Sequence, residues 1–474
     1  MFSKSQLNEK KIYDIIVVGS GLSSLTFVDS YLEKNKKIDI ISFRKTKKKF
    51  PQINNKHILK ILPPQMIGEE KQVLDYFSIN KILVKSDVKF FGSLEFGGLS
   101  NYWGLQIDKN IKDDISKISK KTQKKILNSF VEIFNKQNLL GEIDEKHQNL
   151  FEKNSYIDQS FLKRNKTLKN EEPLLAFQKK GKKQKINLNS INEKNDSLTA
   201  NNYFKKYLKN KKINFHNFFV EKISKDKKNV VLFCSNGINK KIFLTKKLVL
   251  GSGTLITTKL IMDYLEINKE IKINHHPRLF SLYLSKKKWI NKMNFQPSHF
   301  HLKLRKNPSL FTADFRPGNK LIINAIIKFK KVLTPFKFLL NFFREHFIFS
   351  NIFLHPKFGN LYIKRQKNFF VVYTKKSNHK NNFKTFGKLI FNFLKESKKI
   401  FPFHINYFPG FGADFHYFGT LLMGRSRNFH VNEKCQLNKN KNIYIVDGSV
   451  LKFQKNKYPL GAVMANARRI GKEI

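Results

Sequence analysis

Short runs of β-branched and other apolar residues, each bounded by polar residues or by glycine, predict buried strands along this chain. One such run covers 12–18, a stretch with helical character covers 22–34, and a second apolar run covers 37–43. Strands buried on both faces read as nearly continuous apolar runs, and the order strand, turn, helix, strand begins a doubly wound sheet. The chain therefore opens as an α/β domain.

The middle of the chain alternates between polar and strand-rich segments. Residues 110–212 are rich in Lys and Asn, with helical character near 114–138. Several short strands follow from 213 and resemble a meander with a turn at 235–240. Residues 246–265 then give another strand, glycine turn and helix. A second strand-turn-helix unit of this kind is expected to return to the opening sheet.

The last two hundred residues divide into two parts. Residues 270–405 are rich in aromatic side chains and predict a substrate-side domain. Residues 406–474 contain a strand over 442–450 and a closing helix that starts at Pro459. Proline suits the first turn of a helix, where its missing N–H costs nothing.

Composition changes this picture little. The 474 residues carry a formal net charge of +56, with lysines spread from Lys4 to Lys472 and no nucleic-acid motif. Lys, Asn, Ile and Phe all have A/T-rich codons, so an A/T-rich genome explains their joint excess. The charge does not favour nucleic acid as a partner; attraction to anionic lipid or an acidic substrate follows from it more readily.

No run of about 18 uninterrupted apolar residues occurs, so no transmembrane helix is expected. The nearest approach, 334–358, is interpreted as a buried amphipathic element of the substrate domain, with an interfacial membrane helix as the alternative. Cys234 and Cys435 cannot form a disulfide framework or a cysteine-based zinc site. A cytoplasmic protein is expected, with peripheral contact at the inner face of the membrane left open.

The turn at 19–24 has the chemistry of a nucleotide-binding turn. Gly19 permits a tight bend, Gly21 leaves room for a pyrophosphate above the helix N-terminus, and the small Ser24 lets helix and strand pack closely. An acidic residue is expected about 20 residues further on to bind a ribose hydroxyl. Ser42 holds that place, while Arg44 beyond it keeps an NADP-type ribose phosphate open.

Three further segments resemble motifs of the glucose–methanol–choline oxidoreductase family of FAD enzymes. They are "GGLSNYWG" at 97–104, "LVLGSGTLITTKLIM" at 248–262, and the C-terminal "HYFGTLLMG", "NIYIVDGSV" and "YPLGAVMANA". The resemblance implies FAD as the cofactor. It implies that these residues approach FAD: Gly97, Gly98, Ser100, Asn101, Gly251, Gly253, Asp447 and Gly448, beside Gly19, Gly21, Ser24 and Ser42 from the first turn.

The fold class implied is α/β, with a Rossmann-like FAD-binding domain and a discontinuous α+β substrate domain built on an antiparallel sheet. The expected segments are 1–110 (FAD domain), 111–212 (substrate-side insertion), 213–268 (FAD domain), 269–405 (substrate domain) and 406–474 (return to the FAD domain with the catalytic segment).

Alcohol oxidation by a flavin needs a base for the hydroxyl proton, and histidine suits this best because its ordinary pKa is about 6.5. Thirteen histidines are present, and His275 and His276 are interpreted as structural or loop residues. His416 lies in H-x-x-G-T, which resembles the family's catalytic-base motif. Tyr458 stands where the family usually has a second His or Asn; a phenol donates a hydrogen bond but is a poor base at neutral pH.

The leading hypothesis is an FAD-dependent oxidoreductase that acts on a CH–OH group, with a small-molecule alcohol, of polyol or sugar-like type by family breadth, and an unidentified electron acceptor. Two alternatives remain: a flavin-fold enzyme with CH–CH oxidation or NADP-linked reduction, and a degenerate cofactor-binding protein that acts as a basic membrane-surface module.

Overall fold

The structure is a computed structural model of the chain. It describes residues 11–43, 50, 53–62, 66–108, 110–136, 139–143, 159–170, 174–178, 185–186, 196–205, 207, 210–226, 228–288, 300–318, 320, 323–324, 327, 331–375, 380–454 and 457–474.

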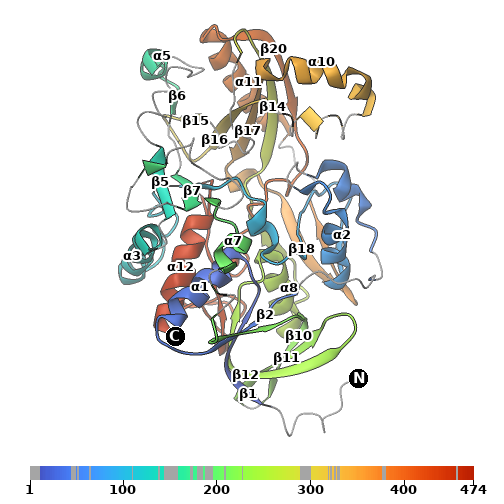
Figure 1. Cartoon of the computed structure of the whole chain (residues 1–474), viewed down its shortest axis with the longest axis vertical. Coiled ribbons are helices and arrows are strands. Elements are labelled where there is room, and N and C mark those ends of the chain that lie inside the picture. Colours follow the sequence, from blue (N-terminus) through green and yellow to red (C-terminus); the bar gives the residue numbers. More distant parts are fainter. Residues whose placement is uncertain are drawn as a thin grey trace.

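A largely parallel sheet forms one end of the molecule (Figure 1). Strand β1 (Ile12–Val18) lies between β2 (Ile38–Ile41) and β12 (Lys240–Leu250), parallel to both. Strand β9 (Ile213–His216) continues the parallel order beyond β2, and β22 (Asn440–Ile445) pairs parallel with β12. The apolar runs that predicted β1 and β2 are fully buried over most of their length, which confirms both strands.

Antiparallel strands extend this sheet. Strands β10 (Phe219–Asp226) and β11 (Asn229–Ser235) form the predicted meander with β12, and the short β21 (Gln436–Leu437) pairs with β22. The meander does not include β9, which joins the parallel part instead. The helices around the sheet are α1 (Leu22–Leu32), α3 (Lys120–Lys136), α7 (Ala200–Lys205), α8 (Thr254–Tyr264) and α12 (Leu460–Glu473).

An antiparallel sheet of six strands forms the other end of the molecule (Figure 1). Helix α11 (Lys380–Glu396) packs on one face of this sheet, and Phe383, Ile390 and Phe393 are buried there. The parallel sheet and this separate antiparallel sheet confirm the predicted α/β fold class. The strand order is β20 (Ile400–Tyr407), β14 (Arg278–Ser285), β17 (Phe347–Leu354), β16 (Phe311–Pro317), β15 (Phe300–Leu304) and β6 (Leu168–Asn170).

Two small sheets lie between these ends. One pairs β3 from the first segment of the chain with strands from the aromatic-rich region, so the two regions are interleaved. The first small sheet consists of β3 (Ile82–Val84), β13 (Ile271–Ile273), β18 (Leu361–Gln366) and β19 (Phe369–Tyr373), with α2 (Glu70–Ile79) beside β3. The second consists of β4 (Gln106–Ile107), β5 (Leu139–Ile143), β7 (Leu174–Gln178) and β8 (Lys185–Ile186). Helix α5 (Gln159–Arg164) lies beside β6 of the antiparallel sheet. Short 3₁₀ turns cover Lys56–Ile61, Gly98–Asn101, Lys331–Phe336, Arg344–His346, Pro356–Phe358 and Gly448–Val450.

The prediction of one buried element over 334–358 is wrong for its first half. Helix α10 (Lys337–Phe342) buries none of its residues, and Phe338 is 83% exposed, whereas β17 is an inner strand of the antiparallel sheet. The apolar pattern therefore divides at 343–346, between an exposed helix and a buried strand. Across the described ranges, no helix combines the length and the hydropathy needed to cross a bilayer.

Helices α1 and α12 lie in close contact and hold the two ends of the chain together. The fully buried Arg468 of α12 forms ion pairs of 2.6 Å with Glu33 and 2.8 Å with Glu132. Gly471 makes the approach of the two helices possible, because a Cβ at that position would lie 2.0 Å from Ser30 Oγ and 2.6 Å from the Phe27 carbonyl oxygen.

We therefore expect Gly471→Ala to lower the free energy of unfolding by about 1–3 kcal/mol through overpacking, as measured by urea denaturation. Gly104→Ala is the matched control, since a Cβ there would meet no atom closer than 3.6 Å. A Gly471→Ala protein as stable as the control would contradict the packing argument.

Candidate functional site

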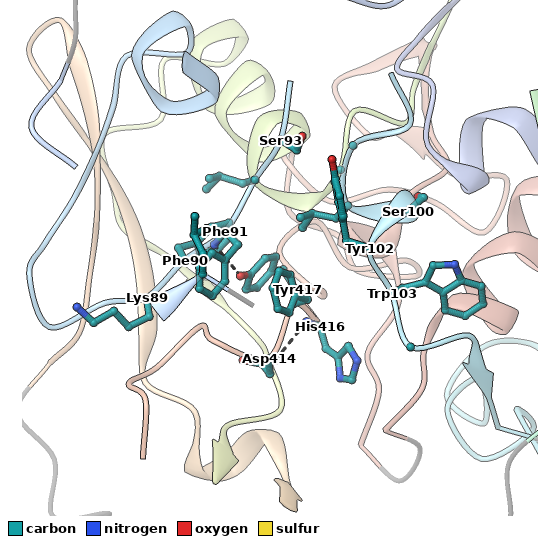
Figure 2. Close-up of a pocket in the computed structure, with 18 of the residues that line it drawn as sticks. Lys89, Phe90, Phe91, Ser93, Ser100, Tyr102, Trp103, Asp414, His416 and Tyr417 are labelled. Carbon is teal, nitrogen blue, oxygen red and sulfur yellow. Dashed lines mark hydrogen bonds between the residues drawn. The ribbon is translucent and has the colours of Figure 1, made fainter. Parts of the chain in front are cut away.

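A cavity of 1390 Å³ extends from the glycine turns of the parallel sheet to one face of the antiparallel sheet. It exceeds the roughly 300–1,000 Å³ of common small-molecule pockets, so it has room for a large cofactor and a substrate together. Figure 2 shows part of its wall, with Ser100, Tyr102 and Trp103 from the 91–104 loop and Asp414, His416 and Tyr417 from the C-terminal segment.

The first glycine turn opens the N-terminus of α1 to the cavity. Gly21 is the N-cap of α1, has no side chain of its own to cap this end, and lines the cavity. Gly19 has φ +112°, and a Cβ there would lie 2.4 Å from the Gly251 carbonyl oxygen. The two glycine turns therefore touch backbone to backbone. Uncapped N–H groups at a helix start form a site suited to phosphate.

Hydroxyl groups tie the first turn to its neighbours. Ser42 Oγ donates to Ser20 Oγ (2.7 Å), which in turn accepts from the Gly97 backbone N–H (2.9 Å). Ser100 Oγ accepts from the Leu22 N–H at the start of α1 (3.1 Å). Ser42 thus lies on the cavity wall where the ribose-binding residue was expected, and its hydroxyl already has a partner.

The 91–104 loop needs its glycines for conformation and for close contact. Gly97 and Gly98 have φ +88° and +52°, in the left-handed region. A Cβ on Gly97 would lie 2.5 Å from the Cβ of Ala200. The loop therefore packs against α7 on one side and lines the cavity on the other.

The glycine turn at 251–253 and the segment with Asp447 and Gly448 meet at the same wall of the cavity. Asp447 is buried, and its carboxylate accepts from the Ser449 N–H (3.0 Å) and from the Ser449 and Thr257 hydroxyls. Burial raises the pKa of Asp447, against these hydrogen bonds. Gly253, with φ +84° and no atom within 4 Å of its missing Cβ, leaves the start of α8 open.

The structure brings most of the expected residues onto one wall and leaves two off it. Ser24 Oγ donates to the Gly251 carbonyl oxygen (3.0 Å), which is helix-to-strand packing. Asn101 holds the loop through bonds to Phe96 and Asn201. Arg44 falls outside the described residues. The expected site residues that line the cavity are Gly19, Gly21, Ser42, Gly97, Gly98, Ser100, Gly251, Gly253, Asp447, Gly448, His416 and Tyr458.

His416 is held on the wall from both sides. Its ring lies 4.9 Å from the Phe353 ring, and its backbone N–H donates to Asp414 Oδ2 (3.3 Å), as drawn in Figure 2. Burial, with Arg278 and Lys457 nearby, lowers the pKa of His416 to about 4 despite Asp414. The imidazole is therefore neutral at physiological pH.

His276, interpreted from sequence as structural, fixes the tautomer of His416. His276 Nε2 lies 3.2 Å from the Phe453 carbonyl oxygen, and because a carbonyl only accepts, Nε2 carries the proton. Burial keeps the pKa of His276 well below 6.5, so its Nδ1 is an acceptor. His416 Nδ1, at 3.4 Å, must then be the donor. This leaves His416 Nε2 with its lone pair.

Tyr458 is the second expected catalytic residue. Its backbone N–H donates to Asp108 Oδ2 (2.9 Å), and its ring lies 6.5 Å from that of His416. Among the described residues its buried Oη finds no hydrogen-bond partner. Burial raises the pKa of Tyr458 well above 10, so the hydroxyl remains protonated and can donate to a ligand oxygen.

No protein-family model matches the chain, and no curated protein matches it in sequence. A solved structure does match: pyridoxine 4-oxidase from Mesorbium loti aligns with 97% of this chain and 99% of that chain, at a TM-score of 0.64 and 12% sequence identity. The chain therefore shares its fold with this oxidase. At this identity the likeness concerns the fold, and the chemistry has to be argued from this chain's own residues.

The residues present fit an FAD molecule. The cavity connects the start of α1 with the His416 segment, and Pro459 and Leu460 bring the start of α12, which has no side-chain cap, to the same wall. The positive start of one helix would favour a pyrophosphate. The positive start of the other would favour a ring system that gains negative charge on reduction.

The buried histidines make the fold sensitive to acid. Burial lowers the pKa values of His416, His430 and the half-buried His355 to about 4, and it lowers those of His276 and His301 well below 6.5. In the unfolded chain these groups titrate near 6.5. Between about pH 6.5 and 4 the unfolded state therefore binds more protons than the native state, and stability falls as pH falls.

We expect the urea midpoint to fall when the pH is lowered from 7.5 to 5.0. The free energy of unfolding should fall by on the order of 1 kcal/mol per buried histidine. His430→Gln, which removes one such group away from the cavity, should reduce the pH dependence. A midpoint that does not change over this interval would contradict the predicted burial of the neutral rings.

Proposed function

We propose that this protein is an FAD-dependent oxidoreductase that acts on a CH–OH group, with His416 as the base. The observation that carries the proposal is the position of a neutral imidazole, with a free Nε2 lone pair, on the wall of the cavity that the three glycine turns line. The fold of pyridoxine 4-oxidase, itself an oxidase by name, supports the same class of reaction.

FAD, when bound, supplies the hydride acceptor. Gly21 and the start of α1 would hold its pyrophosphate, and Asp447 and Gly448 would hold its ribityl side. The start of α12 would stabilise the negative charge that the flavin gains on reduction.

His416 Nε2 takes the hydroxyl proton of the substrate. Its low pKa gives it a free lone pair at neutral pH, and the Nδ1–H directed at His276 keeps the ring oriented. Tyr458 Oη donates a hydrogen bond to the same substrate oxygen and helps to orient it. Tyr458 thus acts as a hydrogen-bond donor at the position where the family usually has a second His or Asn.

Other readings remain distinguishable by experiment. Flavin bleaching by NADPH and not by alcohols would favour an NADP-linked enzyme, and a colourless protein that binds liposomes or polyanions at about 0.15 M salt would favour a basic surface module.

The exposed aromatic residues of α10 and β20, such as Phe338 and Phe403, keep peripheral membrane contact as a prediction. The substrate is proposed as a small alcohol of polyol or sugar-like type, with a separate electron acceptor.

We expect His416→Ala to retain yellow, FAD-loaded protein and to slow flavin reduction by substrate alcohols by about 10²-fold or more, as measured by anaerobic stopped-flow absorbance. His346→Ala is the matched control, since this half-buried histidine does not line the cavity. Flavin reduction at the normal rate in His416→Ala would remove His416 from the mechanism.

Gly21→Val tests the cofactor position. Gly21 has an ordinary φ of −68°, and a Cβ there would come no closer than 3.3 Å to another atom, so the variant should fold. Its side chain would occupy space at the start of α1 that the pyrophosphate needs. We expect FAD to be absent from the absorbance spectrum of the purified variant while its circular dichroism is unchanged; full FAD occupancy would contradict the assignment.

A further inference from the structure

One face of the antiparallel sheet forms the wall of the cavity opposite the glycine turns. Alternate residues of β14 and β17 point to it, including Phe280, Phe349 and Phe353, while the intervening side chains are buried on the side of α11. Within this mostly apolar wall lie two guanidinium groups, Arg278 of β14 and Arg316 of β16.

Arg278 lies beside the candidate catalytic histidine. Its Cζ is 4.2 Å from the centre of the Phe280 ring, 6.0 Å from that of Phe353 and 5.8 Å from that of Phe415. Phe353 is also the ring on which His416 packs, at 4.9 Å, and Phe415 directly precedes His416. Arg278 and His416 therefore flank the same aromatic ring.

The Arg278 guanidinium has no ion-pair or hydrogen-bond partner among the described residues, and its Nε is buried without an acceptor. Burial lowers the pKa of Arg278 to about 10, although Asp414 and Asp314 lie near enough to oppose the shift. Arg278 as a whole is only partly buried and lines the cavity, and leaving such a cation without a partner is unfavourable.

The two nearby carboxylates are already engaged by other donors. Asp414 accepts from His275 Nδ1 (2.8 Å) and from the backbone N–H of His276 (2.9 Å). Asp314 Oδ1 accepts from Asn351 Nδ2 (2.8 Å), and its Oδ2 accepts from Arg316 (3.2 Å). Both carboxylates bond to these donors, and neither forms an ion pair with Arg278.

Arg316 adds a second, partly neutralised cation to the same wall. Its NH2 forms the ion pair with Asp314, while its Nε is buried without an acceptor. A guanidinium offers donors in a fork that matches the two oxygens of a carboxylate or phosphate. Two such groups on a mostly apolar wall are well suited to an oxyanion.

We infer that the substrate is a hydroxylated oxyanion, an alcohol that carries a carboxylate or phosphate group, and that Arg278 binds this group while His416 faces the hydroxyl. The inference rests on the proposed function and names the substrate class of the same site. Arg316 assists as a second donor. The aromatic side chains around Arg278 exclude water and strengthen the charge-assisted bonds.

The test measures anion binding without turnover. Isothermal titration calorimetry of the FAD-loaded protein with acetate and with inorganic phosphate is compared with acetamide, the neutral isostere of acetate. We expect at least one anion to bind the wild type and acetamide to bind about 10- to 100-fold more weakly or not at all. Preference for acetate or phosphate distinguishes a carboxylate from a phosphate ester as the substrate's anionic group.

Arg278→Gln should reduce the affinity for that anion by the same 10- to 100-fold factor and retain bound FAD. Arg427→Gln is the charge-matched control, because Arg427 is exposed and does not line the cavity. Anion affinity that is equal in both variants, equal binding of acetamide and acetate, or no anion binding at all would each overturn the inference. Should Arg278→Gln lose FAD, Arg316→Gln provides the second measurement, with a smaller loss of affinity expected.

Turnover separates this inference from the proposed function. Glycerol, glycerate and glycerol 3-phosphate are compared as substrates. A kcat/KM for glycerate or glycerol 3-phosphate at least about 10-fold above that for glycerol would support both the proposed function and the substrate class. A flavin that no alcohol reduces, in a protein that binds anions through Arg278, would overturn the proposed function alone. Equal reduction by all three would overturn the substrate class alone.

Discussion

The fully buried carboxylate of Asp414 holds the candidate active site together. Three donors from two distant segments converge on it: the His275 ring and the backbone N–H groups of His276 and His416. A buried carboxylate is stable only when such bonds are made, and bonds to a charged acceptor are stronger than neutral ones. Because both segments satisfy one charge, His276 and His416 are fixed at the 3.4 Å that sets the tautomer.

The same carboxylate explains the local backbone. Phe415, between Asp414 and His416, has φ +65°, a conformation that costs energy for a bulky residue. The hydrogen bonds that Asp414 accepts from His275, His276 and His416 offset the strain at Phe415. They also direct the His416 ring toward the cavity. Asp414 forms no ion pair with Arg278, and its oxygens accept from these donors instead. One carboxylate thereby positions the base and leaves a cation available for a ligand.

Sequence reasoning predicted the elements whose chemistry is local. The strand, glycine turn and helix at 12–34 carry their own signals, because glycine conformation and apolar runs act over a few residues. The contact of Gly19 with Gly251 follows from adjacent parallel strands and also could be expected. By contrast, Ser24 and Asn101 have the right residue types in the right motifs, yet their side chains bond protein groups off the cavity.

The role of His276 could not be read from its neighbours, because it depends on a carbonyl 177 positions away and on a histidine 140 positions away. The position of Arg278 could not be predicted either. Side chains of a strand alternate between its two faces, and the sequence does not say which face of the sheet receives the Arg278 charge. Only the pairing of β14 with β17, which sets Arg278 opposite Phe353, puts its guanidinium on the wall with His416. A charged residue inside a strand bounded by apolar neighbours is the signal available in sequence, and it indicates a buried ligand site once the register is known.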